Sequence, residues 1–290
     1  MKRIITIASL AALVCTPICA QETLKLAGSD LIAPCISGTL QDLAKKGNIN
    51  LDINMRGTYS AFEDLKNGKS DIAIIALPRG RNAPDGLTLI PFAYQVAIVI
   101  ANPINPLEEI SAEQLKNIFS ASADNRLESW QQLNIKNIGM RNIMPVLFND
   151  SKNVVVELFK YSAMDGTNIA SWVNVVPSMQ DLINTVKSNN SALAVVGKVQ
   201  DPKTVKIIAV SKGGNSQYAF RPDINSIFNG DYPMTLNFYI AYDKKNSAKI
   251  KPLVKMLLDN SIAQCIDSSD FFSAPENSRK KSLFELDIAQ

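Results

Sequence analysis

The sequence predicts an α/β protein whose first part contains a parallel sheet, and three observations carry that prediction. An alternating apolar strand at 24–28 is followed by a glycine turn and a helical pattern that runs to residue 46. A second strand, turn and helix cover 49–66. Residues 71–77 then form a continuous apolar run, which is typical of a strand buried on both faces of a parallel sheet. Strands alternating with helices at this spacing indicate a βαβαβ unit.

The turns after the first two strands are the first candidates for a functional site. Gly28 ends the first strand, and Ser29 or Asp30 is expected to cap the helix that follows. The second turn places hydroxyl side chains after Gly57, namely Thr58, Tyr59 and Ser60. Both turns are expected side by side at one edge of the sheet. A helix that starts there directs unpaired N–H groups at a ligand, which suits an anion or another polar group.

The start of the chain reads as a secretory signal peptide over residues 1–20. Two basic residues precede an apolar run at 4–14, and the sequence turns polar after Ala20, where we expect cleavage. Cys19 lacks the small preceding residue of a lipoprotein signal, which disfavours lipidation. No later stretch reaches the roughly 18–20 apolar residues of a transmembrane helix. We therefore expect a secreted, periplasmic protein.

Composition excludes several functions. Lys and Arg (30) nearly balance Asp and Glu (27), so we expect no nucleic-acid partner. The chain contains no histidine, which removes Ser-His-Asp and Cys-His hydrolysis and His-ligated zinc. We predict no cofactor, no metal site, no catalytic residues and no enzymatic activity.

Two cysteines follow the predicted cleavage site, Cys35 and Cys265. In an oxidising compartment they can form a disulfide, and closing so long a loop would add on the order of 4 kcal/mol on the chain-entropy model. Two buried free thiols are the alternative. The sequence leaves both open, because it does not say whether the two helices touch.

The later part of the chain continues the α/β pattern. Ser111 is placed to cap a helix in which Leu115, Ile118 and Phe119 share a face. The further elements that we expect are strands at 143–148 and 192–197 with 205–210 beside the latter, and helices at 154–161, 179–186 and 250–263. The last of these helices would bring Cys265 back to the start of the fold.

The order of motifs along residues 24–265 resembles the substrate-binding proteins of phosphate ABC transporters. Gly68–Ala73 fits a "Gly-x-x-Asp-Ile-Ala" strand, and the apolar stretch at 91–103 follows it. Ile110–Ser120 is similar to that family's "Leu-Thr-x-x-Gln-Leu-x-x-Ile-Phe-x-Gly" helix, with Trp130 trailing. Tyr232–Thr235 looks like its "Tyr-Pro-Leu-Thr".

The resemblance implies the type II periplasmic binding protein fold, with two lobes that are each a mixed sheet flanked by helices. The chain would cross between the lobes at 92–102 and 236–242. Residues 21–95 plus 240–290 would form lobe 1, and residues 96–239 lobe 2. The implied function is capture of a small polar or anionic solute in an interlobe cleft by a monomer, which then presents it to an ABC permease.

The charged residues with which this family grips phosphate are replaced here. In the family the strand that corresponds to 147–150 delivers an arginine, but here it ends in Asn149-Asp150. The family's next helix starts with Ser-Gly-Thr, but here the helix start reads Ser151-Lys152-Asn153. No acid follows the strand at 71–77. The ligand-binding residues carried over are Ser29, Asp30, Thr58, Tyr59, Ser60, Asn149 and Ser151, with Arg56 and Lys152 as candidate anion contacts.

Two other functions stay open. The missing arginine and carboxylate favour a sensory or adhesion module in the envelope, built on the same fold without transport. An enzyme on this scaffold would need an acid–base pair, and Asp30 facing Asp150 is the candidate that we can name.

Overall fold

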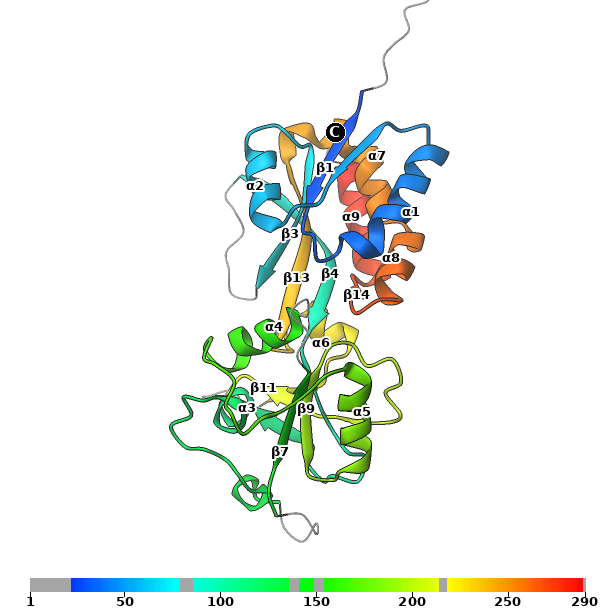
Figure 1. The fold of residues 1–290 in the computed structure, drawn as a ribbon. Coiled ribbons are helices and arrows are strands. Elements are labelled where there is room, and N and C mark those ends of the chain that lie inside the picture. The colour runs from blue at the N-terminus through cyan, green and yellow to red at the C-terminus, as the bar shows by residue number, and fades with distance from the viewer. Residues whose placement is uncertain (1–21, 79–85, 136–140, 149–153, 214–217, 289–290) are drawn as a thin grey trace, which may run out of the picture.

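The computed structural model describes residues 22–78, 86–135, 141–148, 154–213 and 218–288. Figure 1 shows two α/β bodies, one above the other, joined by two strands. We call the body around the six-stranded sheet the first lobe, and the body around the five-stranded and three-stranded sheets the second lobe. The predicted signal peptide, residues 1–20, lies outside the described residues.

The sheet of the first lobe has the strand order β14-β4-β13-β3-β1-β2. Its strands are β1 (Leu24–Gly28), β2 (Leu51–Asn54), β3 (Ile72–Pro78), β4 (Leu87–Val96), β13 (Thr235–Asp243) and β14 (Phe272–Ser273). β1 pairs in parallel with both β2 and β3, as the βαβαβ prediction requires. β13 lies antiparallel between β3 and β4, so a late segment of the chain completes the early sheet.

Helices cover both faces of this sheet. They are α1 (Ala33–Lys46), α2 (Thr58–Lys66), α7 (Ser247–Leu257), α8 (Asn260–Asp267) and α9 (Glu276–Ile288), with a short 3₁₀ turn η2 (Lys244–Asn246) before α7. α2 covers one face, where Ala61 and Leu65 pack against Ile75 of β3. The other helices lie on the opposite side (Figure 1).

The second lobe holds a sheet of order β10-β5-β9-β7-β8 and a small one of order β12-β11-β6. Its strands are β5 (Ile98–Ala101), β6 (Glu109–Ser111), β7 (Met144–Phe148), β8 (Asn174–Val176), β9 (Ala192–Val196), β10 (Lys206–Ile207), β11 (Ala209–Ser211) and β12 (Ala219–Phe220). Its helical segments are α3 (Ala112–Phe119), η1 (Trp130–Leu133), α4 (Val154–Ala163), α5 (Met179–Ser188) and α6 (Ile224–Phe228).

The predicted cap of α3 is confirmed. The Ser111 hydroxyl accepts a hydrogen bond from the Gln114 backbone N–H at 3.0 Å, and the Gln114 side-chain oxygen accepts one from the Ser111 N–H at 2.8 Å. This reciprocal capping box satisfies two N–H groups that a helix start otherwise leaves unpaired.

Two sequence-based expectations about later elements are wrong. Residues 205–210 do not lie beside β9, because β5 occupies that edge; the segment divides into β10, which pairs with β5, and β11, which pairs with β6. The single helix expected at 250–263 is two helices. Asp259 accepts from the Ser261 N–H at 2.8 Å and caps a second helix, α8.

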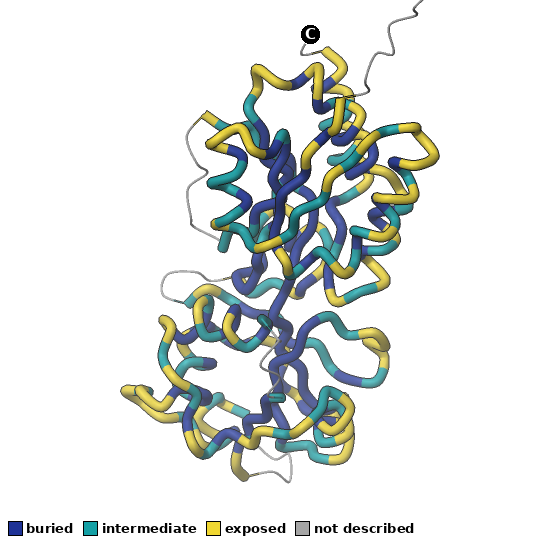
Figure 2. The backbone as a smooth tube through the Cα atoms, turned by 45° about the horizontal axis from the view of Figure 1, so that its top comes forward, coloured by how far each residue is buried: buried dark blue, intermediate teal, exposed yellow. Residues whose placement is uncertain are grey.

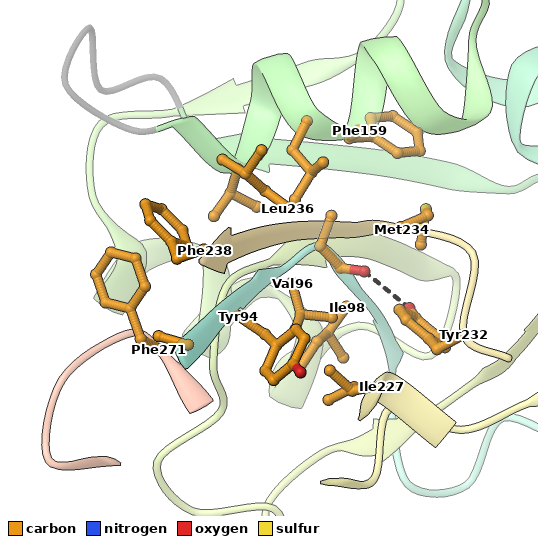
Figure 3. Close-up of a cluster of buried hydrophobic side chains, with 14 of the residues drawn as sticks. Tyr94, Val96, Ile98, Phe159, Ile227, Tyr232, Met234, Leu236, Phe238 and Phe271 are labelled. Atoms are coloured by element: carbon orange, nitrogen blue, oxygen red, sulfur yellow. Dashed lines mark hydrogen bonds between the residues drawn. The ribbon is translucent and has the colours of Figure 1, made fainter. Parts of the chain in front are cut away.

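The chain passes between the lobes twice: it leaves the first sheet at the end of β4 and returns to it at the start of β13. β4 ends at Val96 and β5 begins at Ile98, so the chain changes sheets at Ala97. The Tyr232 hydroxyl donates to the Ala97 carbonyl at 2.7 Å within a cluster of buried apolar side chains (Figure 3). Figure 2 shows buried backbone continuing from one lobe into the other. The predicted lobe boundaries, 95/96 and 239/240, fall on these crossing strands and stay a prediction.

Candidate functional site

Two turns meet at the edge of the first sheet where the chain crosses to the second lobe. At this edge Leu236 pairs with Pro78 and Thr235 pairs with Val96, so β3 ends where β13 begins. The Gly57 N–H donates to the Gly28 carbonyl at 3.0 Å. The prediction that the turns after β1 and β2 lie side by side is therefore confirmed.

Ser29 is buried in the first of these turns, with 1% of its surface exposed. Its N–H donates to the Ile74 carbonyl at 2.8 Å, which fixes the turn to β3. The prediction that Ser29 or Asp30 caps α1 is wrong, because a turn at 30–32 intervenes and Ile32 takes the cap position without a side-chain hydrogen bond. The hydroxyl instead accepts a long hydrogen bond of 3.4 Å from the Leu31 N–H.

The second turn uses its hydroxyl to hold the sheet. Gly57 has a φ of 116°, a conformation that favours glycine, and α2 begins at the next residue. The Thr58 hydroxyl accepts from the Ala76 N–H at 2.9 Å and so joins the start of α2 to the end of β3. Tyr59 is 78% exposed, so its side chain is accessible, and Ser60 is half-buried.

The charges around these turns differ from those of an anion site. The Asp30 carboxylate is exposed, and its Oδ1 lies 3.8 Å from the position that a Cβ on Gly57 would occupy. Arg56 donates to Asp64 at 2.9 Å, so the predicted anion contact is engaged with a carboxylate of α2. The guanidinium would have to leave Asp64 to reach a ligand.

The candidates from the second lobe cannot be placed. Asn149, Ser151 and Lys152, like Asp150 of the alternative acid–base pair, lie outside the described residues. The helix that follows them, α4, begins at Val154 and packs against β4 and β13.

Sequence reasoning missed three polar side chains on the crossing strands. Gln95 Oε1, Thr235 Oγ1 and Asn237 Oδ1 are buried and have no hydrogen-bond partner; in the described part of the chain Ser70 and Trp130 carry the other such atoms. A buried unpaired polar atom costs about 1–3 kcal/mol, and native proteins keep few of them. The signal was present in the sequence, since each residue interrupts an apolar crossing segment.

The two cysteines lie on facing helices. The Cys35 thiol of α1 donates to the Ser269 hydroxyl at 3.3 Å, and Cys265 of α8 lies 3.0 Å from the Thr39 hydroxyl. The expectation that Cys265 returns to the part of the fold that holds Cys35 is confirmed. Both are free thiols in this structure, and burial raises the pKa of Cys35. The disulfide stays a prediction.

The described ranges contain no group of three or more His, Cys, Asp or Glu side chains arranged to hold a metal ion. No helix among them combines the length and apolar character needed to cross a bilayer.

Comparison with known proteins gives the family. A model of the PBP superfamily domain matches residues 16–260. The phosphate-binding protein PstS of Pseudomonas aeruginosa is 20% identical over 282 residues, covering 90% of this chain and 86% of PstS. Protein SphX of Synechococcus elongatus is 21% identical over 248 residues, covering 81% of this chain and 72% of SphX.

Solved structures agree on the fold. PstS from Borrelia burgdorferi superposes with a TM-score of 0.69 at 16% identity, covering 88% of this chain and 99% of that one. An ABC-type phosphate transport receptor from Vibrio cholerae gives a TM-score of 0.61 at 19% identity, with coverage of 86% and 99%. The prediction of a two-lobe, type II binding-protein fold is confirmed, and the chain belongs to the PBP superfamily.

Proposed function

We propose that this protein captures a small polar or anionic solute between its two lobes and presents it to an ABC permease from the periplasm. The observation that carries the proposal is the pair of joined turns, Gly28–Ser29 and Gly57–Thr58, at the edge where both strands cross to the second lobe. Relatives named as phosphate-binding proteins, which align with most of the chain, support it.

The proposed mechanism is closure of the two lobes around the solute. A solute that contacts both lobes binds the closed arrangement more tightly than the open one, and it shifts the equilibrium by that difference in affinity. β4 and β13 are the segments that would bend or twist, because the chain passes between the lobes through them.

Charge is the feature that separates this site from a phosphate site. An anion at the two turns would meet the Asp30 carboxylate while Arg56 is held by Asp64. Like charges repel strongly where water is partly excluded. A polar solute of low charge therefore suits the described side of the site better than a doubly charged oxyanion does.

Thermal unfolding of the purified chain with millimolar phosphate, other oxyanions and small polar metabolites tests the proposal. A solute at about 100 times its dissociation constant should stabilise the fold by about 2.7 kcal/mol, a shift of a few degrees. Asp30→Asn should strengthen any phosphate shift by removing the repulsion, whereas Asp42→Asn, an exposed carboxylate on α1, should not change it.

Two outcomes would change the proposal. If phosphate stabilises the protein and Arg56→Ala abolishes the effect, Arg56 leaves Asp64 to bind the anion and the site is a phosphate site after all. If no solute shifts the unfolding temperature, the protein is better described as an envelope module without solute capture, a function that the Asp30 and Arg56 geometry also favours.

A further inference from the structure

One lysine of the second lobe reaches into the first. Lys198 follows β9, and its ammonium donates to the carbonyl oxygens of Asp267 at 2.6 Å and Phe271 at 2.9 Å.

The first lobe surrounds this ammonium on several sides. Besides the two carbonyls, Asp267 Oδ1 lies 3.9 Å from Nζ and the ring centroid of Phe272 lies 4.7 Å from it. The Asp267 carbonyl belongs to the last turn of α8, where the helix dipole favours a cation. The side chain of Lys198 is 16% exposed. We call this set of interactions the Lys198 contact.

The segment that carries these acceptors, residues 267–273, is called the acceptor loop here, and the first lobe holds it in place. Both oxygens of the Asp267 carboxylate accept from Ser273, one from the N–H and one from the hydroxyl, each at 2.8 Å. Phe271 packs edge-to-face on Phe238 of β13 with 5.4 Å between ring centroids. The acceptors are therefore arranged before the lysine arrives, and little ordering is needed when the contact forms.

We propose that the Lys198 contact holds the two lobes in the arrangement seen here and opens when they separate. A lysine that leaves two carbonyls and a carboxylate exchanges them for water, so separation of the lobes loses charge-assisted hydrogen bonds. Burial lowers the pKa of Lys198, which Asp267 and Asp270 counteract. The proposal goes beyond solute capture and holds whether or not a solute binds.

The contact also lies next to the candidate site. Ser269, within the acceptor loop, accepts from the Cys35 thiol in the first turn of α1, and α1 follows the turn that contains Ser29. One helix, α1, therefore connects the acceptor loop with the turn that contains Ser29.

Single-molecule energy transfer between dyes on the two lobes tests the proposal without a solute. Dyes attached through unnatural amino acids at the exposed positions 42 of α1 and 180 of α5 leave both native cysteines in place. Lys198→Met keeps the alkyl chain and removes the charge. We expect the ratio of separated to close arrangements to rise about tenfold or more, the effect of one hydrogen bond to a charged group.

Lys187→Met is the matched control, because Lys187 is an exposed lysine of the same lobe in the last turn of α5. Phe272→Leu, which removes the ring beneath the ammonium from the other lobe, should act in the same direction as Lys198→Met with a smaller effect. Circular dichroism checks that each variant is folded. The proposal is overturned if Lys198→Met leaves the distribution unchanged, or if Lys187→Met changes it equally.

Discussion

Two of the connections between the lobes, as the described residues show them, are built from opposite kinds of chemistry. The crossing strands are covalent and packed with buried apolar side chains such as Phe238 and Tyr232 (Figure 3). The Lys198 contact, in contrast, is a single ammonium on carbonyl oxygens. Apolar packing changes little when neighbouring groups rotate slightly, but a hydrogen bond is lost within an ångström or two. The crossing therefore fixes where the lobes meet, and the contact selects one orientation among those the crossing permits.

The largest expected effect is from removing apolar packing at the crossing. Phe238 is fully buried in β13 and packs edge-to-face against Phe271, so Phe238→Ala leaves a cavity in the core. We expect the free energy of unfolding to fall by about 3–5 kcal/mol, measured by urea denaturation. Phe284→Ala, on the exposed side of α9, should change it by less than about 0.5 kcal/mol. If both variants lose the same free energy of unfolding, packing at the crossing contributes no more to stability than an exposed side chain does.

A smaller effect is expected from the hydrogen bond at Ala97. Tyr232→Phe keeps the ring and leaves the Ala97 carbonyl without its side-chain donor, which should lower the free energy of unfolding by about 1–2 kcal/mol. Tyr161→Phe, on the half-exposed face of α4, is the control and should have almost no effect. If Tyr232→Phe leaves the free energy of unfolding unchanged, water replaces the hydroxyl as the donor to the Ala97 carbonyl.

Two threonines extend the comparison, because the Thr235 hydroxyl has no hydrogen-bond partner and the Thr58 hydroxyl has one. Thr235→Val removes a buried oxygen that has no partner and should be neutral or stabilise the fold by up to about 1 kcal/mol. Thr58→Val removes an oxygen that accepts from the Ala76 N–H and should destabilise by about 1 kcal/mol. Thermal unfolding of both variants measures the difference. A destabilising Thr235→Val would mean that water or a ligand satisfies that hydroxyl.

The smallest effect concerns reaction rates and not stability. Because burial raises the pKa of Cys35, less of its thiol is ionised near pH 8, and it should react more slowly with iodoacetamide than a cysteine of ordinary pKa in a peptide. Mass spectrometry of the folded protein without reductant measures the rate. If neither cysteine reacts until a reductant is added, Cys35 and Cys265 form the predicted disulfide.

How far the sequence predicts the molecule depends on the range of the interactions concerned. The strand at 71–77 and the capped helix after Ser111 follow from local patterns, and both are present as β3 and α3. The position of β5 between β9 and β10 depends on pairing between distant segments, which periodicity does not encode.

The candidate site follows the same rule. Glycine turns at strand ends place Ser29 and Thr58 together, as predicted, because chain direction in a parallel sheet decides this. What each hydroxyl binds was not predictable, since Thr58 bonds to β3 and Ser29 is buried instead of capping α1. Gln95 and Asn237 interrupt an apolar pattern that the sequence shows, but the absence of a hydrogen-bond partner for their oxygens depends on neighbours that only the fold supplies.

The place of β13 in the first sheet has a consequence for how the chain folds. β3 and β4 are not neighbours, because β13 lies between them, and Ile74 pairs with Ile240 far along the chain. During synthesis the second lobe has all of its strands, β5 to β12, before β13 is made. Until then the edges of β3 and β4 that pair with β13 stay unpaired, which is the condition under which chains pair with each other. A nascent chain that stalls before Thr235 would therefore be the form most prone to aggregate.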